Sequence, residues 1–212
     1  MLTPETIVAN FDRLRDLCGP ANLKDRSGPF IAMLDHLGER LALCPASAKV
    51  EYHNCFPGGL VEHSLRVLDF ASEWHKGLKR TLSGKVRKDS LIIACIGHDL
   101  GKVGDHEQAY YIPLARENEW KREKWGQHYD YNDQLTYMTV PFRALWLLQH
   151  FGIRLTQDEA LAIHLSDGQY VPDNASYKLK EPDLALIVHQ ADILATRWEK
   201  EHQTAESRIE KS

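Results

Sequence analysis

Cysteine is scarce in this sequence, and no long apolar run occurs in it. The four cysteines include no pair at CxxC spacing, so the pattern gives no sign of a disulfide framework or of a cysteine-based zinc site. No apolar stretch reaches the roughly 18 residues that a membrane-spanning helix needs. The first residues also lack the basic and then apolar pattern of a secretory signal. We therefore expect a cytoplasmic protein of a reducing compartment (the host cytoplasm if a phage encodes it) that does not bind membranes.

Charge of one sign is not in excess either. The net charge is −4, which gives no general attraction to nucleic acid, although a local basic patch stays open. Hydrophobic residues make up 43% and charged residues 26% of the 212 positions, as in ordinary globular proteins, and no internal repeat is present. This length fits one domain, or one domain with an appendage.

Most of the chain has helical periodicity. Apolar residues recur three and four positions apart, and typical capping or helix-ending residues stand at the ends of these segments. The expected helices begin near Thr3, Pro29, Leu60, Leu91, Leu135, Thr156 and Glu181; the helices from Leu91 and Glu181 extend to about Gly101 and His202. We expect residues 1–44 to pack as N-terminal helices on a core of residues 45–203, with residues 204–212 as a polar tail.

Two segments lack this helical pattern. The basic run 78–88 predicts a solvated loop or, alternatively, a rim that attracts phosphate. Residues 103–133 are polar and aromatic, with room for a short strand at 110–112, and we expect a long loop insertion here. Trp120 and Trp125, with basic residues between them, would suit a surface that stacks on bases. A lid or an ordinary surface insertion has the same composition.

Polar residues stand on the apolar faces of three expected helices. His63 follows Leu60 by one turn, and Asp192 lies on the apolar stripe of the last helix. His98 and Asp99 directly follow an apolar run. A buried, ionised Asp is costly unless it is paired or binds a metal. Each case alone fits a core histidine or a His–Asp pair, but together the residue types suit a hard or borderline divalent cation.

The sequence blocks around these residues resemble a known family. Gly58–Ser64 has the sequence GGLVEHS, His98–Lys102 has HDLGK, and His189–Asp192 has HQAD. In this order they are similar to the HD-domain metal-dependent phosphohydrolases, and most to the branch with GGLxEHS and HDxGK blocks, which includes 3′–5′ exoribonuclease-like and phage HD proteins. The resemblance covers roughly residues 45–199. It implies an all-α HD-domain bundle of about seven to nine helices that hydrolyses a phosphate ester.

The resemblance also implies roles for single residues. The implied ligands of a divalent ion (Mn, Mg, Co, Fe, Ni or Zn) are His63, His98, Asp99 and Asp192. Four such donors leave two positions of an octahedral ion for water and a phosphate oxygen. Asp99 could also take the proton of the attacking water. Lys102 could neutralise phosphate charge, or it could interact with the carbonyl end of a helix.

Relatives with a second metal have further histidines that this sequence lacks. Residues 135–138 contain no imidazole, and Ser166 stands where a histidine is expected, although His164 or His128 could compensate. We therefore expect one ion per chain. The candidate substrate residues are weaker predictions, because ordinary loop packing explains each of them equally well. They are His53, Arg66, Tyr110, Asp167, Gln169 and Tyr170.

These observations predict a phosphohydrolase that acts on a nucleoside mono- or triphosphate through a metal-activated water. The first alternative is a 3′–5′ exonuclease on single-stranded nucleic acid, which is less favoured because the chain is acidic and has no separate nucleic-acid-binding domain. A non-catalytic nucleotide-binding regulator, or a structural domain with buried His–Asp pairs, would contain the same buried residues. The sequence leaves the native metal, the exact substrate and the oligomeric state open.

Overall fold

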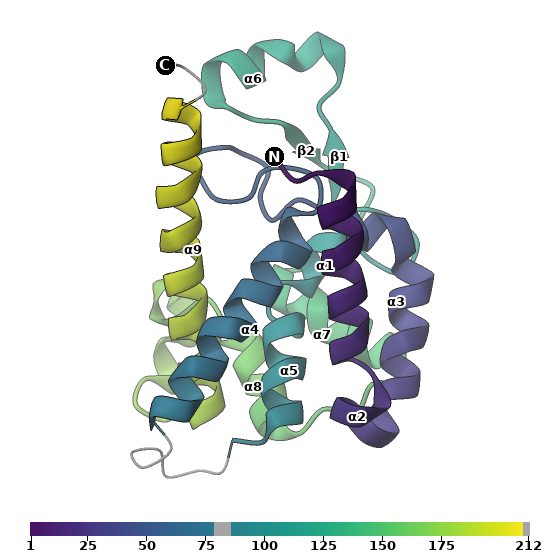
Figure 1. Ribbon diagram of the computed structural model, residues 1–212, viewed down its shortest axis with the longest axis vertical. Helices are drawn as coiled ribbons and strands as arrows, with labels where there is room; N and C mark the ends of the chain where they lie inside the picture. Colours follow the sequence, from purple (N-terminus) through teal and green to yellow (C-terminus); the bar gives the residue numbers. More distant parts are fainter. Residues whose placement is uncertain (79–85, 210–212) are drawn as a thin grey trace.

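Helices account for nearly all of the regular secondary structure, which confirms the predicted all-α class (Figure 1). The computed structural model describes residues 1–78 and 86–209, with side chains up to residue 202; most of the basic run 78–88 and the end of the polar tail lie outside the described residues. The α-helices are α1 (Pro4–Leu17), α2 (Pro20–Leu23), α3 (Ser27–Ala42), α4 (Gly59–Leu78), α5 (Lys88–Gly97), α6 (Glu119–Trp125), α7 (Val140–His150), α8 (Gln157–His164) and α9 (Asp183–Ile209). The 3₁₀ helices are η1 (Lys24–Arg26), η2 (Leu100–Val103), η3 (Arg116–Asn118), η4 (Gly168–Tyr170) and η5 (Pro172–Tyr177). The strands are β1 (Tyr111–Pro113) and β2 (Tyr129–Tyr131).

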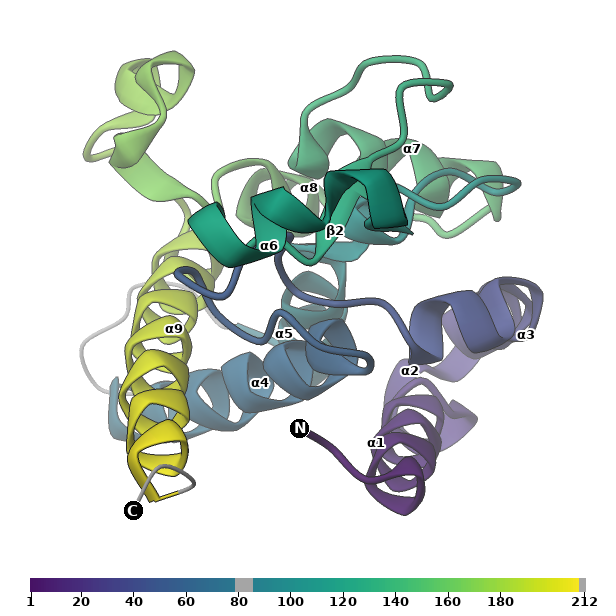
Figure 2. The same cartoon turned by 90° about the horizontal axis from the view of Figure 1, so that it is seen from above.

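Helix α5 lies at the centre of the molecule, in contact with α4, α8 and α9 (Figure 2). Every residue from Asp89 to Gly97 is buried, which explains why this stretch is apolar around its whole circumference rather than on one face. Helix α4 packs extensively along α9, and α1 and α3 pack on α4. The three sequence blocks that carry the candidate ligands, on α4, after α5 and on α9, are therefore side by side.

Several helix starts follow their sequence signals. The Thr3 hydroxyl caps α1, and Thr156 and Glu159 form the predicted capping box of α8. Helix α7 starts at Val140 rather than near Leu135 as predicted, because Pro141 occupies its first turn and Thr139 provides the cap. The proline therefore opens α7.

Two helix ends differ from the sequence prediction. Helix α5 ends at Gly97 rather than at Gly101, and a short 3₁₀ helix follows it. Gly101 instead allows η2 to pack closely on α7, because a Cβ atom there would lie 2.1 Å from the carbonyl oxygen of Val140. Helix α9 continues past the predicted end at His202 to Ile209.

The insertion between η2 and α7 is folded rather than a plain loop. Strands β1 and β2 pair in antiparallel fashion, with Tyr111 opposite Tyr131, and the predicted short strand is thereby confirmed. Helix α6 connects the two strands, and this unit lies at the upper end of the molecule in Figure 1. The amide of Val50 donates to the carbonyl oxygen of Gly126 at 2.9 Å. The insertion is thus hydrogen-bonded to the irregular segment 45–58 that precedes α4.

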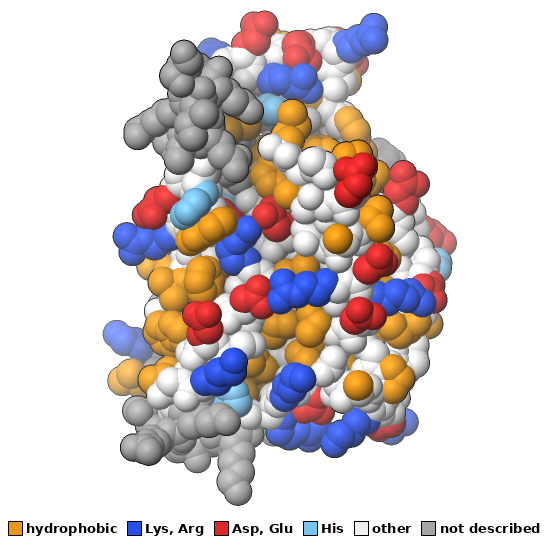
Figure 3. Space-filling view, in the orientation of Figure 1, with side chains coloured by type: hydrophobic (Ala, Val, Ile, Leu, Met, Phe, Trp, Pro, Cys, Tyr) orange, Lys and Arg blue, Asp and Glu red, His pale blue; other side chains and the backbone are white. Residues whose placement is uncertain are grey.

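The surface seen in Figure 3 has acidic and basic side chains interspersed. Ion pairs such as Arg13–Asp69 and Arg15–Asp35 join neighbouring helices. This face therefore offers no broad area of one charge sign. In the described part of the chain, no helix combines the length and the apolarity required to cross a membrane.

Candidate metal centre

Three helices bring two imidazoles and a carboxylate to one point. His63 lies on α4, His98 directly follows α5, and Asp192 lies on α9. The Nε2 atom of His63 is 3.1 Å from Oδ1 of Asp192 and 3.3 Å from Nε2 of His98. Neighbouring ligands of one ion, with bonds of about 2.1 Å, lie about 3.0–3.4 Å apart. These donors are therefore spaced like ligands that share an ion.

Asp99 adds a second carboxylate at the same point. Its Oδ2 atom lies 3.5 Å from Nε2 of His98 and 3.7 Å from Nε2 of His63. The ammonium group of Lys102, on η2, donates to the same oxygen at 2.6 Å. Lys102 thus places a positive charge beside the donor set, where it balances the carboxylates.

A hydrogen bond fixes the far nitrogen of each imidazole. Nδ1 of His98 donates to the carbonyl oxygen of Cys95 at 2.7 Å, which leaves Nε2 with a free lone pair. Nδ1 of His63 lies 3.0 Å from Oε2 of Glu199, whose exposed fraction is 1%. Metal-binding histidines are usually oriented in this way, by a carbonyl or a carboxylate on the far nitrogen. Both Nε2 atoms are therefore directed at the centre.

Glu199 is a residue that the sequence analysis missed. Arg66 donates to Glu199 and, at 2.8 Å, to Oε1 of Glu62, and its guanidinium carbon lies 4.2 Å from the ring centroid of Trp198. The structure thus places Arg66, a candidate substrate residue, where it supports Glu199. The spacing could have identified it, because Glu199 stands seven positions after Asp192 and so lies on the same face of the helix.

The charges at the centre shift several pKa values. Burial alone would lower the pKa of His63, but the Glu199 and Asp192 carboxylates outweigh it and raise this pKa to about 10. Burial alone would raise the pKa values of Asp99 and Asp192. The charge of Lys102 outweighs burial at Asp99, and the hydrogen bond with His63 outweighs it at Asp192, so both pKa values lie below the ordinary range. Ionised carboxylates around a protonated imidazole suit a cation that displaces the proton.

A third imidazole lies at the same point. The ring centroid of His53, from the segment between α3 and α4, is 4.5 Å from that of His63. One donor atom each of His53, His63 and Asp99 lie within 4.8 Å of one another, and so do donor atoms of His63, His98 and Asp192. Burial, and then repulsion from His63, lowers the pKa of His53 to about 3, so this ring is neutral at pH 7.

Comparison with protein families assigns the fold. The family model for the HD domain matches residues 60–197 and therefore includes all four predicted ligands. This chain belongs to the HD-domain family. HD domains are in general metal-dependent hydrolases, and here the chain has groups of His and Asp that could hold a divalent ion. No curated protein and no solved structure matches the chain, so the particular branch of the HD family stays a prediction.

An open cavity adjoins the HD-domain centre at Asp192. Its volume is about 560 Å³, and its walls come from α9 and from the segment that follows α8. Asp167 and Tyr170, two of the candidate substrate residues, are part of these walls, together with the cationic Arg197 and Lys200 of α9. The cavity is therefore a route by which a charged ligand can approach the donors.

The segment that carries this wall fits closely onto α9. Gly168 has a φ of +58°, and a Cβ atom there would lie 2.2 Å from the ring of His189. The same ring donates from Nδ1 to the carbonyl oxygen of Ser166 at 2.7 Å. Because only glycine fits this position, the wall of the HD-domain cavity has a fixed place relative to α9.

The structure does not bring four other sequence candidates to the donors. They are His128, His164, Tyr110 and Gln169. In residues 1–78 and 86–202, neither histidine belongs to a group of three or more metal-capable donors. The ring centroid of the tyrosine lies 4.6 Å from the guanidinium carbon of Arg143, and the glutamine donates to Glu181 at 2.7 Å.

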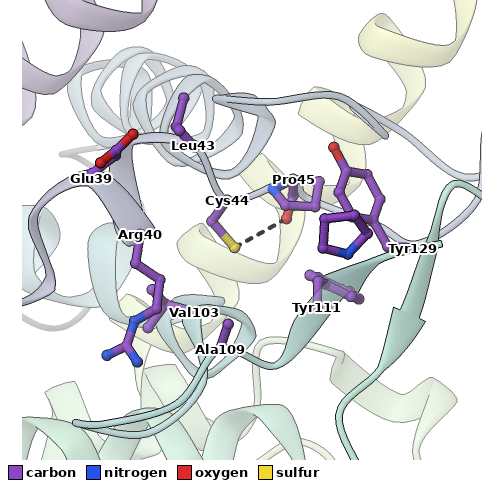
Figure 4. A pocket seen from close by; sticks show the side chains of 10 residues that line it. Glu39, Arg40, Leu43, Cys44, Pro45, Val103, Ala109, Tyr111 and Tyr129 are labelled. Atoms are coloured by element: carbon purple, nitrogen blue, oxygen red, sulfur yellow. Dashed lines mark hydrogen bonds between the residues drawn. The ribbon is translucent and has the colours of Figure 1, made fainter. Parts of the chain in front are cut away.

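A second cavity, of about 370 Å³, lies beside the end of α3. Figure 4 shows Arg40 on one side of it, Tyr111 and Tyr129 on the other, and Cys44 between them. The thiol of Cys44 donates to the carbonyl oxygen of Lys102 at 3.3 Å, so η2 lies between this cavity and the HD centre. None of the five donor residues lines it, and it is therefore separate from the candidate metal centre.

Proposed function

We propose that this HD-domain chain is a divalent metal-dependent phosphohydrolase that cleaves a phosphate ester of a nucleotide. The observation that carries the proposal is a set of His and Asp donors that could hold a cation, beside an open cavity. Structural metal sites are closed, whereas catalytic sites keep an accessible position. The donors also fit an ion, since both imidazoles have their far nitrogens engaged and their Nε2 atoms directed at the centre.

The groups around the centre supply what phosphate ester hydrolysis requires. A bound divalent ion would act as a Lewis acid toward a phosphate oxygen and would lower the pKa of water. Asp99 lies at the edge of the donor set and is positioned to accept a proton from the attacking water. Lys102 holds one Asp99 oxygen at 2.6 Å and contributes positive charge where phosphate charge develops.

The cavity supports a nucleotide as the substrate class. Its volume of about 560 Å³ is typical of small-molecule sites. Arg197 and Lys200 in its wall complement phosphate charge, and Tyr170, which is 82% exposed, offers an aromatic ring on which a base can stack. An uncharged ester would use neither the cations nor the ring.

A nucleotide panel tests this proposal. The purified protein is assayed with Mn²⁺, Mg²⁺, Co²⁺ or Fe²⁺ for release of phosphate, pyrophosphate or nucleoside from nucleoside mono- and triphosphates. Asp99→Ala should abolish release, whereas Asp69→Ala, which removes an exposed carboxylate paired with Arg13, should not. Undiminished turnover in Asp99→Ala would refute the proposal, and nucleotide binding without any turnover would indicate a non-catalytic regulator.

One observation favours a second candidate, a 3′–5′ exonuclease of single strands. Trp120 and Trp125 on α6 are 47% and 46% exposed, with ring centroids 4.9 Å apart. Lys49 and Lys124 line an open cavity beside Trp125. Exposed aromatic rings among basic residues are typical of surfaces that bind unpaired bases. A salt-dependent affinity for oligonucleotides that Trp120→Ala and Trp125→Ala both weaken would favour this candidate over mononucleotide hydrolysis.

A further inference from the structure

Two histidine nitrogens are buried without a hydrogen-bond partner among the described residues. They are Nε2 of His53 and Nδ1 of His106. Unpaired buried polar atoms are rare in native proteins, because desolvation without a partner is costly, and each one asks for a functional reason. His106 lies against the rings of Trp146 and His150. His53, in contrast, lies against metal-capable donors.

His53 is within coordinating reach of the centre. Its ring centroid is 4.5 Å from that of His63, and donor atoms of His53, His63 and Asp99 lie within 4.8 Å of one another. Two ligands on opposite sides of one ion, each at about 2.2 Å, are about 4.4 Å apart. The His53 ring therefore fits the same ion with a small adjustment.

The two donor groups at the centre have one imidazole in common. The group that contains His53 shares His63 with the group that contains His98 and Asp192. Glu199 engages Nδ1 of His63 at 3.0 Å, so Nε2 is the nitrogen of that ring that an ion can use. Because one lone pair binds one ion, the two groups describe a single site with five donors.

Backbone contacts hold His53 in this place. The hydroxyl of Ser47 donates to the carbonyl oxygen of His53 at 2.7 Å, and the amide of Ala46 donates to that of Asn54 at 3.0 Å. A Cβ atom on Gly59 would lie 2.1 Å from the Asn54 carbonyl oxygen. The glycine at the start of α4 thus allows the segment before the helix to approach it closely, which fixes the imidazole next to His63.

We propose that His53 is a fifth protein ligand of the metal ion. The inference rests on the proposed metal centre and deepens it. Three imidazoles and two carboxylates leave a six-coordinate ion one position for water or substrate. Imidazole ligands favour first-row transition ions, whereas Mg²⁺ prefers oxygen ligands and keeps several waters. The centre therefore selects an ion of the Mn²⁺ to Zn²⁺ series over Mg²⁺.

Cobalt binding to His53→Ala tests the assignment. Metal-free protein is titrated with Co²⁺, and the affinity, the stoichiometry and the visible absorption spectrum are recorded. The variant should bind Co²⁺ at least about tenfold more weakly than the wild type and with a changed spectrum, because a nitrogen ligand is lost. Added imidazole should restore the wild-type spectrum, since the truncation leaves room for it. His106→Ala removes the other imidazole that has a buried nitrogen without a partner among the described residues, and it is the matched control, with affinity and spectrum unchanged.

Each outcome has a distinct meaning. Wild-type affinity and an unchanged spectrum in His53→Ala would overturn the assignment of His53 and leave the proposed centre intact. A wild-type protein that binds no stoichiometric Co²⁺ would overturn the centre itself. If circular dichroism shows that His53→Ala does not fold, His53→Gln replaces it, and an unchanged Co²⁺ spectrum in that variant overturns the assignment equally.

Discussion

Helix α5 has buried polar side chains at both of its ends, and the two ends differ. At the N-terminal end, Arg26 donates to Glu159 at 2.8 Å and to Asp89 at 2.7 Å, and Ser90 donates to Glu159 at 2.6 Å. Both carboxylates of this cluster have charged partners. At the C-terminal end, two imidazole Nε2 atoms face each other at 3.3 Å. There the His53 ring also has a buried nitrogen without a partner in the described part of the chain.

This difference separates a structural cluster from a binding site. A closed network of hydrogen bonds satisfies its own groups and needs no ligand. Imidazole nitrogens that face one another, or that stay buried without a partner, beside carboxylates suit a cation that all of them can bind. Burial of charged groups, which both ends share, therefore does not identify the functional end; the pattern of partners does.

The largest effect is expected at the C-terminal end. Asp192→Ala should reduce phosphohydrolase activity by at least about 10³-fold, because loss of a ligand removes Lewis-acid stabilisation of several kcal/mol. The metal-free protein should stay folded with a modest loss of melting temperature, since Asp192 pairs with His63 at 3.1 Å and its side chain is 21% exposed. Steady-state kinetics and thermal melting measure the two quantities. If Asp192→Ala lost activity only because the protein unfolds, the two ends of α5 would not differ in function.

The opposite pattern is expected at the N-terminal end. Glu159→Ala should lower the free energy of unfolding by about 3–5 kcal/mol, because Arg26 then stays buried without this partner. Urea unfolding measures the change. Metal affinity of the folded variant should equal that of the wild type, and a folded Glu159→Ala protein that binds no metal would argue against two independent ends.

A smaller effect should follow when the support of His63 is weakened. Glu199→Gln replaces the carboxylate on Nδ1 of His63 by an amide and should lower metal affinity about 10–100-fold. Calorimetric titration with Co²⁺ measures this affinity. Glu62→Gln is the control, because it removes the other carboxylate partner of Arg66 without touching His63. Equal affinities in the two variants would show that Glu199 has no special role.

Metal affinity should also depend on pH. Burial alone would lower the pKa of His63, but Glu199 and Asp192 raise it to about 10, so an ion must displace a proton from this ring at neutral pH. The affinity should therefore rise about tenfold per pH unit between about pH 6 and 9. Titrations at three pH values measure the slope. A flat profile would mean that His63 is not a ligand.

The smallest effect is expected for Asp89 in acid. The hydrogen bond from Arg87, against the opposing effect of burial, holds the pKa of Asp89 below its ordinary 3.8. This carboxylate therefore contributes stability above about pH 4, and the contribution is lost as the pH falls through the folded-state pKa. Asp89→Asn should lower the free energy of unfolding by about 1 kcal/mol at pH 7 and by less at pH 2. Urea unfolding at both pH values measures this loss. A larger loss of unfolding free energy at pH 2 than at pH 7 would contradict the prediction.

Helical periodicity explains why part of the centre could be predicted. His63 and Asp192 lie on the apolar stripes of long, regular helices, so a period of 3.6 residues directs them toward the core. Glu199 lies on the same face as Asp192, but the residues around it are charged, and the apolar stripe stops at Ala195. Its burial depends on packing of α9 against α4, which local composition does not encode.

The position of His53 could not follow from any local period. It lies in the irregular segment 45–58, whose path is set by contact with Gly59 and by hydrogen bonds to the insertion near Gly126. The predicted end of α5 at Gly101 failed for a related reason. A Cβ atom at Gly101 would clash with the carbonyl oxygen of Val140, which lies far along the chain on α7. This glycine therefore serves helix packing and does not end α5.

The number of divalent ions bound per chain tests the convergence of donors most directly. Wild type and His98→Ala are dialysed to equilibrium against the same free Co²⁺ concentration, and bound metal is measured by elemental analysis. We predict one ion per wild-type chain and less than about a tenth of that occupancy in His98→Ala. A wild-type protein without stoichiometric metal, or full occupancy in His98→Ala, would contradict the existence of a shared ion between α4, α5 and α9.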